Sequence, residues 1–319
     1  MFALTLWKTE PYTGLVTERG VFGSAVLLFA LALMGPARPL AQAIERSMYV
    51  SVLNEAGAPV PDLGPADFIV REDNVAREVL RVAPADAPMQ VAVLVDNSEA
   101  ARDDIGDIRR ALPEFVDAMT APAAARGKNE LSIVAVAERP TIFTDYTTDR
   151  AQLQKGIFRI FAQPMSASYL LEGVIEVSRG FKRREAQRPV IVAIVTEGPE
   201  YSSRHFDLVL GPLRDAGAAF HALVLGSPSS DISDEAHNRN VVLAEGTRST
   251  GGRYDNLLAS SALPAAMKRV AAELTHQYLV TYARPQSLIP PDRATVSAAR
   301  PGMTARGILI KAQQERGRP

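Results

Sequence analysis

The sequence contains no cysteine among its 319 residues. Disulfide bonds, thiolate metal sites and cysteine nucleophiles are therefore all excluded. The stability of the fold has to come from a packed core. Hydrophobic residues make up 47% of the chain and charged residues 22%, which is typical of a globular protein.

Neither sign of charge is in excess, since 35 Lys and Arg residues stand against 36 Asp and Glu residues. Nothing therefore draws the protein as a whole toward nucleic acid or anionic lipid. The basic run 182–184 ends a predicted helix, where positive charge stabilises the helix dipole. We interpret this isolated run as a solvated helix end, and expect no nucleic-acid partner.

Two catalytic signatures are also missing: there is no Gly-x-Ser-x-Gly elbow and no phosphate-binding Gly-x-x-x-x-Gly-Lys loop. The four histidines are His205, His221, His237 and His276. No two of them have the four-residue spacing of a zinc site. We expect His221 to be a hydrogen-bonded residue of a strand, and His205 and His237 to face solvent. A hydrolase that uses Asp96 or Glu197 has little support, and we predict that the protein is not an enzyme.

The longest apolar run, residues 21–34, is too short for a membrane-spanning helix, which needs about 20 residues. Lys8 and Arg19 precede the run, and Ala41-Gln42-Ala43 follows it as a small-residue cleavage site. Residues 1–43 are therefore predicted to be a signal peptide of an exported protein, periplasmic or secreted. An uncleaved N-terminal anchor is the alternative, and only then do we expect contact with a membrane.

Short β segments follow the signal peptide. Strands are predicted at residues 49–53, 67–72 and 75–82, with a tight turn at Asp73-Asn74. A Pro-rich linker at residues 83–88 separates them from the next region. We assign residues 44–85 to an N-terminal β segment.

Residues 86–276 alternate buried-looking strands with segments of helical period, which is typical of a doubly wound α/β fold with a mostly parallel sheet. Pro140 precedes the predicted strand 141–144, so we place this strand antiparallel at an edge. The other strands are predicted at 91–95, 131–136, 190–195, 220–225 and 253–254. The helices are predicted at 105–119, 148–161, 169–181, 206–216, 241–245 and 261–275.

Three further strands are predicted at residues 277–282, 294–298 and 306–311. Neither they nor the N-terminal strands look able to close a core alone. We therefore expect the two sets, residues 44–85 and 277–312, to pair in one small β domain. The last residues, 313–319, are predicted to be a disordered tail.

Polar residues begin abruptly where the apolar strand 91–95 ends, at Asp96-Asn97-Ser98-Glu99-Ala100. In a parallel sheet, the carboxyl ends of the strands form the crevice that binds ligands. The order of this motif, Ser166-Ala167-Ser168, Thr196-Glu197-Gly198 and Thr250-Gly251-Gly252 resembles that of the von Willebrand factor type A (VWA) domain. Residues 60–74 and 277–282 are similar to the flanks of an exported bacterial subgroup of that family.

The resemblance implies a metal-ion-dependent adhesion site, with Asp96, Ser98, Ser168 and Glu197 as candidate oxygen ligands of Mg²⁺ or Mn²⁺. The sequence departs from the family pattern at three positions. Ala100 stands where a second serine is expected, Ser168 replaces threonine, and Glu197 replaces aspartate. Since Mg²⁺ wants about six oxygens at short distances, we expect a degenerate site with a weak ion or none. In the alternative interpretation, Asp96 and Ser98 only cap the helix that follows.

The resemblance also implies a non-enzymatic module that binds a protein partner through loops at the carboxyl edge of the sheet. The loops expected to take part are residues 96–100, 164–169, 197–204 and 226–233. Glu197, Tyr201 and Arg204 are the predicted partner-binding residues, because tyrosine and arginine are enriched at the centres of interfaces. The alternative is a structural or assembly protein with an inert crevice, in which the β domain makes the contacts.

Overall fold

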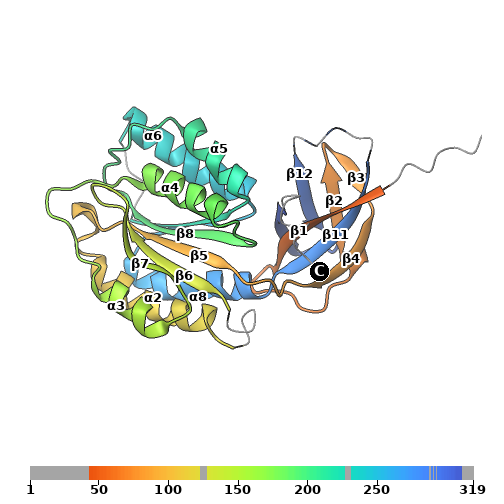
Figure 1. Cartoon of the computed structure of the whole chain (residues 1–319), viewed down its shortest axis with the longest axis horizontal. Coiled ribbons are helices and arrows are strands. Elements are labelled where there is room, and N and C mark those ends of the chain that lie inside the picture. The colour runs from red at the N-terminus through yellow and green to blue at the C-terminus, as the bar shows by residue number, and fades with distance from the viewer. Residues whose placement is uncertain are drawn as a thin grey trace, which may run out of the picture. The chain divides into compact units, whose positions relative to one another are not determined.

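The computed structural model describes residues 43–122, 128–226, 231–286, 289, 291 and 293–310 (Figure 1). Residues 1–42 of the predicted signal peptide and the predicted tail at 313–319 lie outside the described residues. The first described element is β1 (Ala43–Asn54).

A six-stranded sheet carries the crevice, and its strand order is β10-β9-β8-β5-β6-β7. The strands are β5 (Gln90–Val95), β6 (Glu130–Ala135), β7 (Thr141–Thr147), β8 (Pro189–Thr196), β9 (Ala219–Leu225) and β10 (Tyr254–Leu257). All neighbours pair in parallel except β7, which pairs antiparallel with β6 at the edge. The placement predicted from Pro140 is confirmed. Since β5 lies inside the sheet, its carboxyl end opens between those of β6 and β8.

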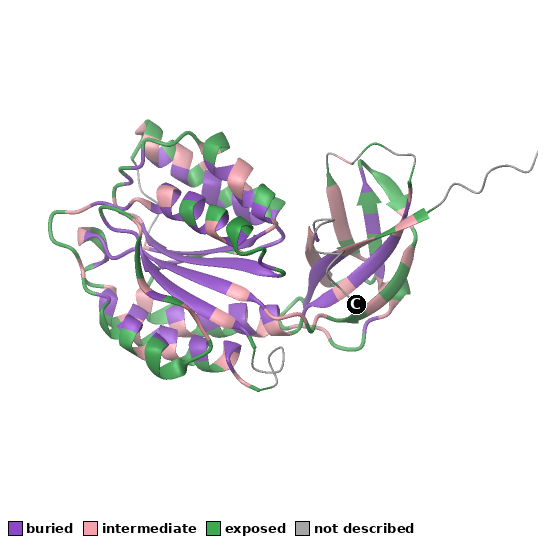
Figure 2. Ribbon diagram, in the orientation of Figure 1, coloured by how far each residue is buried: buried purple, intermediate pink, exposed green. Residues whose placement is uncertain are grey.

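Helices cover both faces of this sheet, so the doubly wound α/β fold is confirmed (Figure 1). One face carries α2 (Ile105–Met119), α3 (Arg150–Phe158) and α8 (Leu263–Thr275). The other carries α4 (Leu170–Arg183), α5 (Phe206–Ala216) and the helical segment that starts with α6 (Asp234–Val241). Along β5, Val91 and Val93 enter one core while Ala92 and Leu94 enter the other, and both faces are buried (Figure 2).

The helical segment that starts with α6 is longer than predicted. It continues through a π-helical turn at Val242–Gly246 to α7 (Thr247–Ser249), whereas the sequence predicted only residues 241–245. The early part of α6 buries only Ala236 and Arg239, so it lacks the apolar period that reveals a helix. Its start is fixed instead by Ser233, whose side chain accepts a hydrogen bond from the Ala236 amide.

Strands from the two ends of the chain do pair, as predicted. One sheet has the order β13-β1-β11-β4 and the other β12-β2-β3. The bounds are β2 (Phe68–Glu72), β3 (Val75–Arg77), β4 (Val79–Pro84), β11 (Tyr278–Pro285), β12 (Ala294–Ala298) and β13 (Met303–Leu309). In the hairpin between β2 and β3, Asp73 and Asn74 have φ of 46° and 68°, the left-handed geometry expected of this turn. Among the described helices, none is long and apolar enough to span a membrane.

Candidate functional site

Asp96 lies at the carboxyl end of β5, and its buried carboxylate ties this strand to β8. Oδ1 accepts a hydrogen bond of 2.9 Å from the Ser98 amide. Oδ2 accepts from the Thr196 hydroxyl at 2.6 Å and from the Thr196 amide at 3.3 Å. The helix-capping interpretation is not supported, because α2 begins only at Ile105 and the Ser98 side chain makes no capping hydrogen bond.

The three loops that the sequence motifs predicted to converge do contact one another. The Glu99 amide donates to the Ser166 carbonyl at 3.3 Å, and the Ser168 amide donates to the Pro199 carbonyl at 3.0 Å. The Ser98 and Ser168 side chains are 0% and 1% exposed. Their hydroxyl oxygens have no hydrogen-bond partner among the described residues. We call the buried side chains of Asp96, Ser98 and Ser168, carried by these contacting loops, the floor of the site.

Ala100 packs tightly against the loop after β8. A Cβ atom added to Gly198 would lie 2.3 Å from the Ala100 Cβ, closer than two carbons can approach. The methyl group of Ala100 thus fills the space that faces Gly198. It supplies no oxygen to the site.

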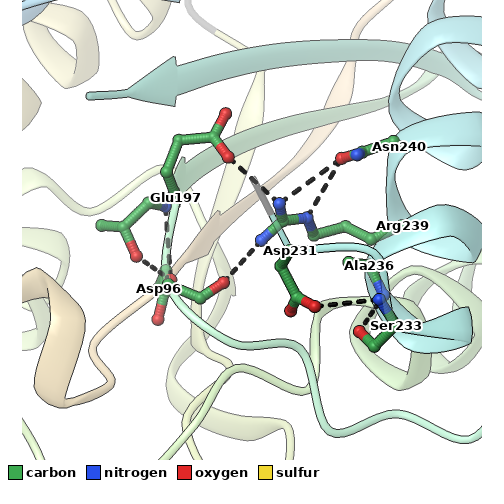
Figure 3. A network of polar contacts seen from close by, with 9 residues as sticks. Asp96, Glu197, Asp231, Ser233, Ala236, Arg239 and Asn240 are labelled. Atoms are coloured by element: carbon green, nitrogen blue, oxygen red, sulfur yellow. Dashed lines mark hydrogen bonds and ion pairs between the residues drawn. The ribbon is translucent and has the colours of Figure 1, made fainter. Parts of the chain in front are cut away.

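The Glu197 carboxylate is turned toward Arg239, which reaches it from the last turn of α6 (Figure 3). Arg239 Nη2 lies 3.1 Å from Glu197 Oε2, and Nη1 donates to the Gly198 carbonyl at 2.6 Å. The Arg239 side chain is 2% exposed and that of Glu197 16% exposed. This buried arginine is the site residue that the sequence did not predict, because the start of α6 was missed.

Glu200 is a second acid that the sequence motifs did not single out. It is 3% exposed, and it accepts hydrogen bonds from the amides of Leu170 at 3.3 Å and Ser202 at 3.1 Å. Burial raises the pKa of Glu200 to about 7, although the Ser202 hydrogen bonds and the Arg239 charge oppose the shift. Glu200 joins the loop after β8 to the first residue of α4. No sequence signal marks this contact, since it connects two segments 30 residues apart.

Large apolar side chains are exposed on the loops that surround this floor. Met165 is 98% exposed, Tyr201 62% and Ile232 97%. The Met165 amide donates to Glu99 Oε2 at 3.2 Å, and the Tyr201 amide donates to the Ser168 carbonyl at 2.8 Å. These bonds tie both residues to the converging loops. We call Met165, Tyr201 and Ile232 the apolar rim.

The other predicted partner-binding residue, Arg204, is half exposed and lies 3.3 Å from the Glu172 carboxylate of α4. The three predicted residues therefore differ in accessibility. Tyr201 and Arg204 can be reached from solvent, whereas Glu197 is mostly covered and already paired with Arg239.

The oxygens at this site fall short of a divalent-ion site of the kind that the resemblance implies. Both oxygens of Asp96 already accept hydrogen bonds, and Glu197 is paired with a fixed cation. The Ser98 and Ser168 hydroxyls have no hydrogen-bond partner among the described residues, but two hydroxyls are few for Mg²⁺, which wants about six oxygens. Among the described residues, no group of three or more His, Asp and Glu side chains is arranged to hold a metal.

The wound sheet and the three loops that meet at the carboxyl ends of its strands define the class of doubly wound α/β domains. Residues 91–199 match the family model of the von Willebrand factor type A domain. The chain therefore contains a VWA domain, as the motifs predicted. A comparison with the curated proteins found no match.

Several solved structures are similar to the chain. A von Willebrand factor type A protein from Catenulispora acidiphila is 11% identical, with 86% of this chain and 75% of that chain covered and a TM-score of 0.49. Proximal thread matrix protein 1 from the mussel byssus is 17% identical, with 64% of this chain and 49% of that chain covered and a TM-score of 0.46. The chain thus spans about half the length of the mussel protein. A structure of that mussel protein with a zinc-occupied adhesion motif is 15% identical, covers 64% of this chain and 50% of that chain, and has a TM-score of 0.45.

Proposed function

We propose that the protein is an exported, non-enzymatic binding module that engages a protein partner through the apolar rim at the carboxyl edge of its VWA sheet. The proposal rests on the exposure of three large apolar side chains, Met165, Tyr201 and Ile232, to solvent. Large exposed apolar side chains on loops at one edge of a domain commonly mark an interaction site. Tyrosine in particular is enriched among the residues that dominate binding energy.

Because the side chains of the floor are buried, we expect the partner to contact the apolar rim rather than a metal ion. In a metal-dependent adhesion site, a carboxylate of the partner completes the coordination shell of an exposed ion. Here the Asp96, Ser98 and Ser168 side chains are at most 1% exposed, so an incoming carboxylate has no path to them. The proposed binding therefore depends weakly or not at all on divalent cations.

Arg204 extends the proposed contact surface on the polar side of the rim. Its side chain is 51% exposed, and the ion pair with Glu172 holds it beside the start of α4. An exposed ion pair at the edge of an interface affects the rate of association more than the affinity. Tyr201 and Met165 are accordingly the better positions for a test of affinity.

The proposal can be tested by site-specific photo-crosslinking with the full chain, expressed in the cells that normally produce it. A photoreactive phenylalanine derivative would replace Tyr201 in one variant, Met165 in a second and Val75 in a third. Val75 is 54% exposed in the β2–β3 hairpin and serves as the matched control. We expect one discrete crosslinked protein from the two rim positions and none from Val75.

The same experiment separates the proposal from the assembly alternative. Crosslinking from Val75 alone would contradict a binding rim and favour contacts through the β domain. A further variant with Met165→Ala and Ile232→Ala should weaken crosslinking from Tyr201 at least tenfold. Leu208→Ala, which removes a 59% exposed leucine from α5, should leave crosslinking unchanged.

A further inference from the structure

We propose that the guanidinium of Arg239 is a built-in cation that performs the structural work of a divalent ion at this crevice. This inference deepens the proposed function, since it names the group that makes the site independent of metal. A divalent ion at the carboxyl edge of a sheet neutralises acidic side chains and links the loops that carry them. Arg239 does both here, with one charge and fixed hydrogen bonds.

The neutralising contact is the ion pair between Arg239 and Glu197. Arg239 Nη2 lies 3.1 Å from Glu197 Oε2, and both side chains are mostly or fully buried. A buried charge has to be paired, because the protein interior solvates it poorly. The carboxylate that corresponds to the family's second acidic ligand is therefore already satisfied by the protein itself.

The linking contact runs from α6 to the loop after β8. Arg239 Nη1 donates to the Gly198 carbonyl at 2.6 Å, next to the residue that Nη2 contacts. The planar guanidinium therefore binds both the Glu197 side chain and the Gly198 backbone of this loop. A single metal ion would link the same loop through two ligands. Asn240 adds a weaker acceptor, with Oδ1 3.4 Å from both Nε and Nη2.

Arg239 is placed by the start of its helix rather than by the crevice. Ser233 caps α6, and the Ser233 amide in turn donates to Asp231 Oδ1 at 2.9 Å (Figure 3). Arg239 follows in the last turn of α6, six residues after the Ser233 cap. The cation is thus presented to Glu197 by a helix whose start is capped by side chains of its own segment.

A divalent ion would meet this arrangement with few ligands and with repulsion. Ala100 supplies no oxygen, and the Asp96 carboxylate accepts three hydrogen bonds from Ser98 and Thr196. The fixed positive charge of Arg239 at Glu197 and Gly198 adds a Coulombic penalty for a second cation. Removal of the guanidinium should take away both the repulsion and the positive charge that neutralises Glu197. A divalent cation should then bind beside Glu197.

The test is a thermal-shift titration of the full chain and its Arg239→Ala variant with MgCl₂ and MnCl₂, each compared with a chelator. The wild-type melting temperature should not change with either metal. The variant should melt lower than the wild type, and saturating Mn²⁺ should raise its melting temperature by about 5 °C through mass action. Wild-type stabilisation by Mn²⁺ that Ser98→Ala abolishes would overturn the proposal.

Three further variants isolate the charge. In Arg239→Ala with Glu197→Gln, both charges are gone, so the Mn²⁺ response should be lost. Arg239→Lys keeps a positive charge and should not respond, although it loses the two-pronged contact. Arg204→Ala, which removes an exposed arginine from the same region, should behave as the wild type.

A folded Arg239→Ala variant that shows no Mn²⁺ response would also overturn the proposal. If this variant does not fold, Arg239→Gln carries the same test with a smaller loss of packing. Direct titration of the wild type with Mn²⁺, followed by electron paramagnetic resonance, gives an independent readout in which binding would again overturn it. None of these measurements involves a partner, so their failure is distinguishable from failure of the rim to bind protein.

Discussion

Arg306 of β13 donates from Nη2 to both carboxylate oxygens of Glu273 in α8, at 2.7 Å each. Glu273 is 1% exposed and Arg306 28% exposed. The pair connects β13 to α8, the last described helix of the α/β fold. Arg306→Ala should destabilise the protein by about 3 kcal/mol, because the nearest remaining cation to this buried carboxylate among the described residues is Arg253 at 3.9 Å. Urea unfolding followed by circular dichroism measures the change.

Arg248→Ala is the matched control for that experiment. Arg248 also pairs with a glutamate, Glu245, but its side chain is 72% exposed. An exposed pair contributes little because water screens it, so this variant should lose less than about 1 kcal/mol. Equal losses in the two variants would contradict the role given to burial.

The burial of His221 predicts that the protein loses stability in mild acid. It is fully buried in β9, and neither ring nitrogen has a hydrogen-bond partner among the described residues, contrary to the hydrogen-bonded role expected from the sequence. Burial lowers the pKa of His221 to about 4. The unfolded chain, with a histidine pKa near 6.5, then binds more protons than the folded one. The stability that depends on neutral His221 is therefore fully present above about pH 6.5 and is lost as the pH falls toward 4. Between pH 7 and pH 5 the loss is about 2 kcal/mol.

His221→Leu should flatten this part of the pH dependence. Leucine is similar in volume, does not titrate and removes two unpaired buried nitrogens. Urea unfolding at pH 7 and pH 5 measures both effects. His237→Gln, at an exposed position of α6, should retain the wild-type slope. A His221→Leu variant with an unchanged slope would refute the assignment.

Replacement of Gly252 by alanine should severely destabilise the protein. A Cβ atom at this position would lie 1.7 Å from the Phe220 carbonyl oxygen, in the backbone of β9. Gly252→Ala should therefore cost at least about 4 kcal/mol or prevent folding, since backbone cannot move aside as a side chain can. Gly211→Ala is the control: nothing lies within 4 Å of its added Cβ in α5, so it should stabilise by about 0.7 kcal/mol. Soluble expression and urea unfolding distinguish the two.

The sequence predicts an element well where its apolar period is strong. Helix α2 has the predicted bounds of 105–119, because residues such as Ile108, Leu112 and Phe115 repeat along one buried face. Strand β5 is similarly unmistakable as a continuous buried run. In contrast, α6 buries an arginine and an alanine among polar residues, so its start depends on the Ser233 cap. A cap is a weaker signal than a period, and the helix was predicted too short.

The candidate site is predictable from the sequence only where its contacts are local or belong to a motif. Asp96, Ser98 and Ser168 are carried by loops that contact one another, as the order of their motifs indicated. The partner of Glu197 is different, because Arg239 comes from 42 residues further along the chain. Its position depends on the packing of α6, which no local pattern encodes. The same long-range packing determines the burial of Glu200.

The burial of Glu200 predicts a pH dependence of stability opposite in sign to that of His221. Burial raises the pKa of Glu200 to about 7, so the folded protein favours the protonated carboxyl. Its favourable contribution is present below the unfolded pKa of about 4.5 and is lost as the pH rises through 7. Glu200→Gln cannot ionise, and its stability relative to the wild type should therefore improve by about 2 kcal/mol between pH 5 and pH 8. Any constant cost from the Leu170 or Ser202 hydrogen bonds cancels in this comparison. Glu114→Gln, a change at a surface position of α2, should show no such improvement when both variants are unfolded in urea at the two pH values.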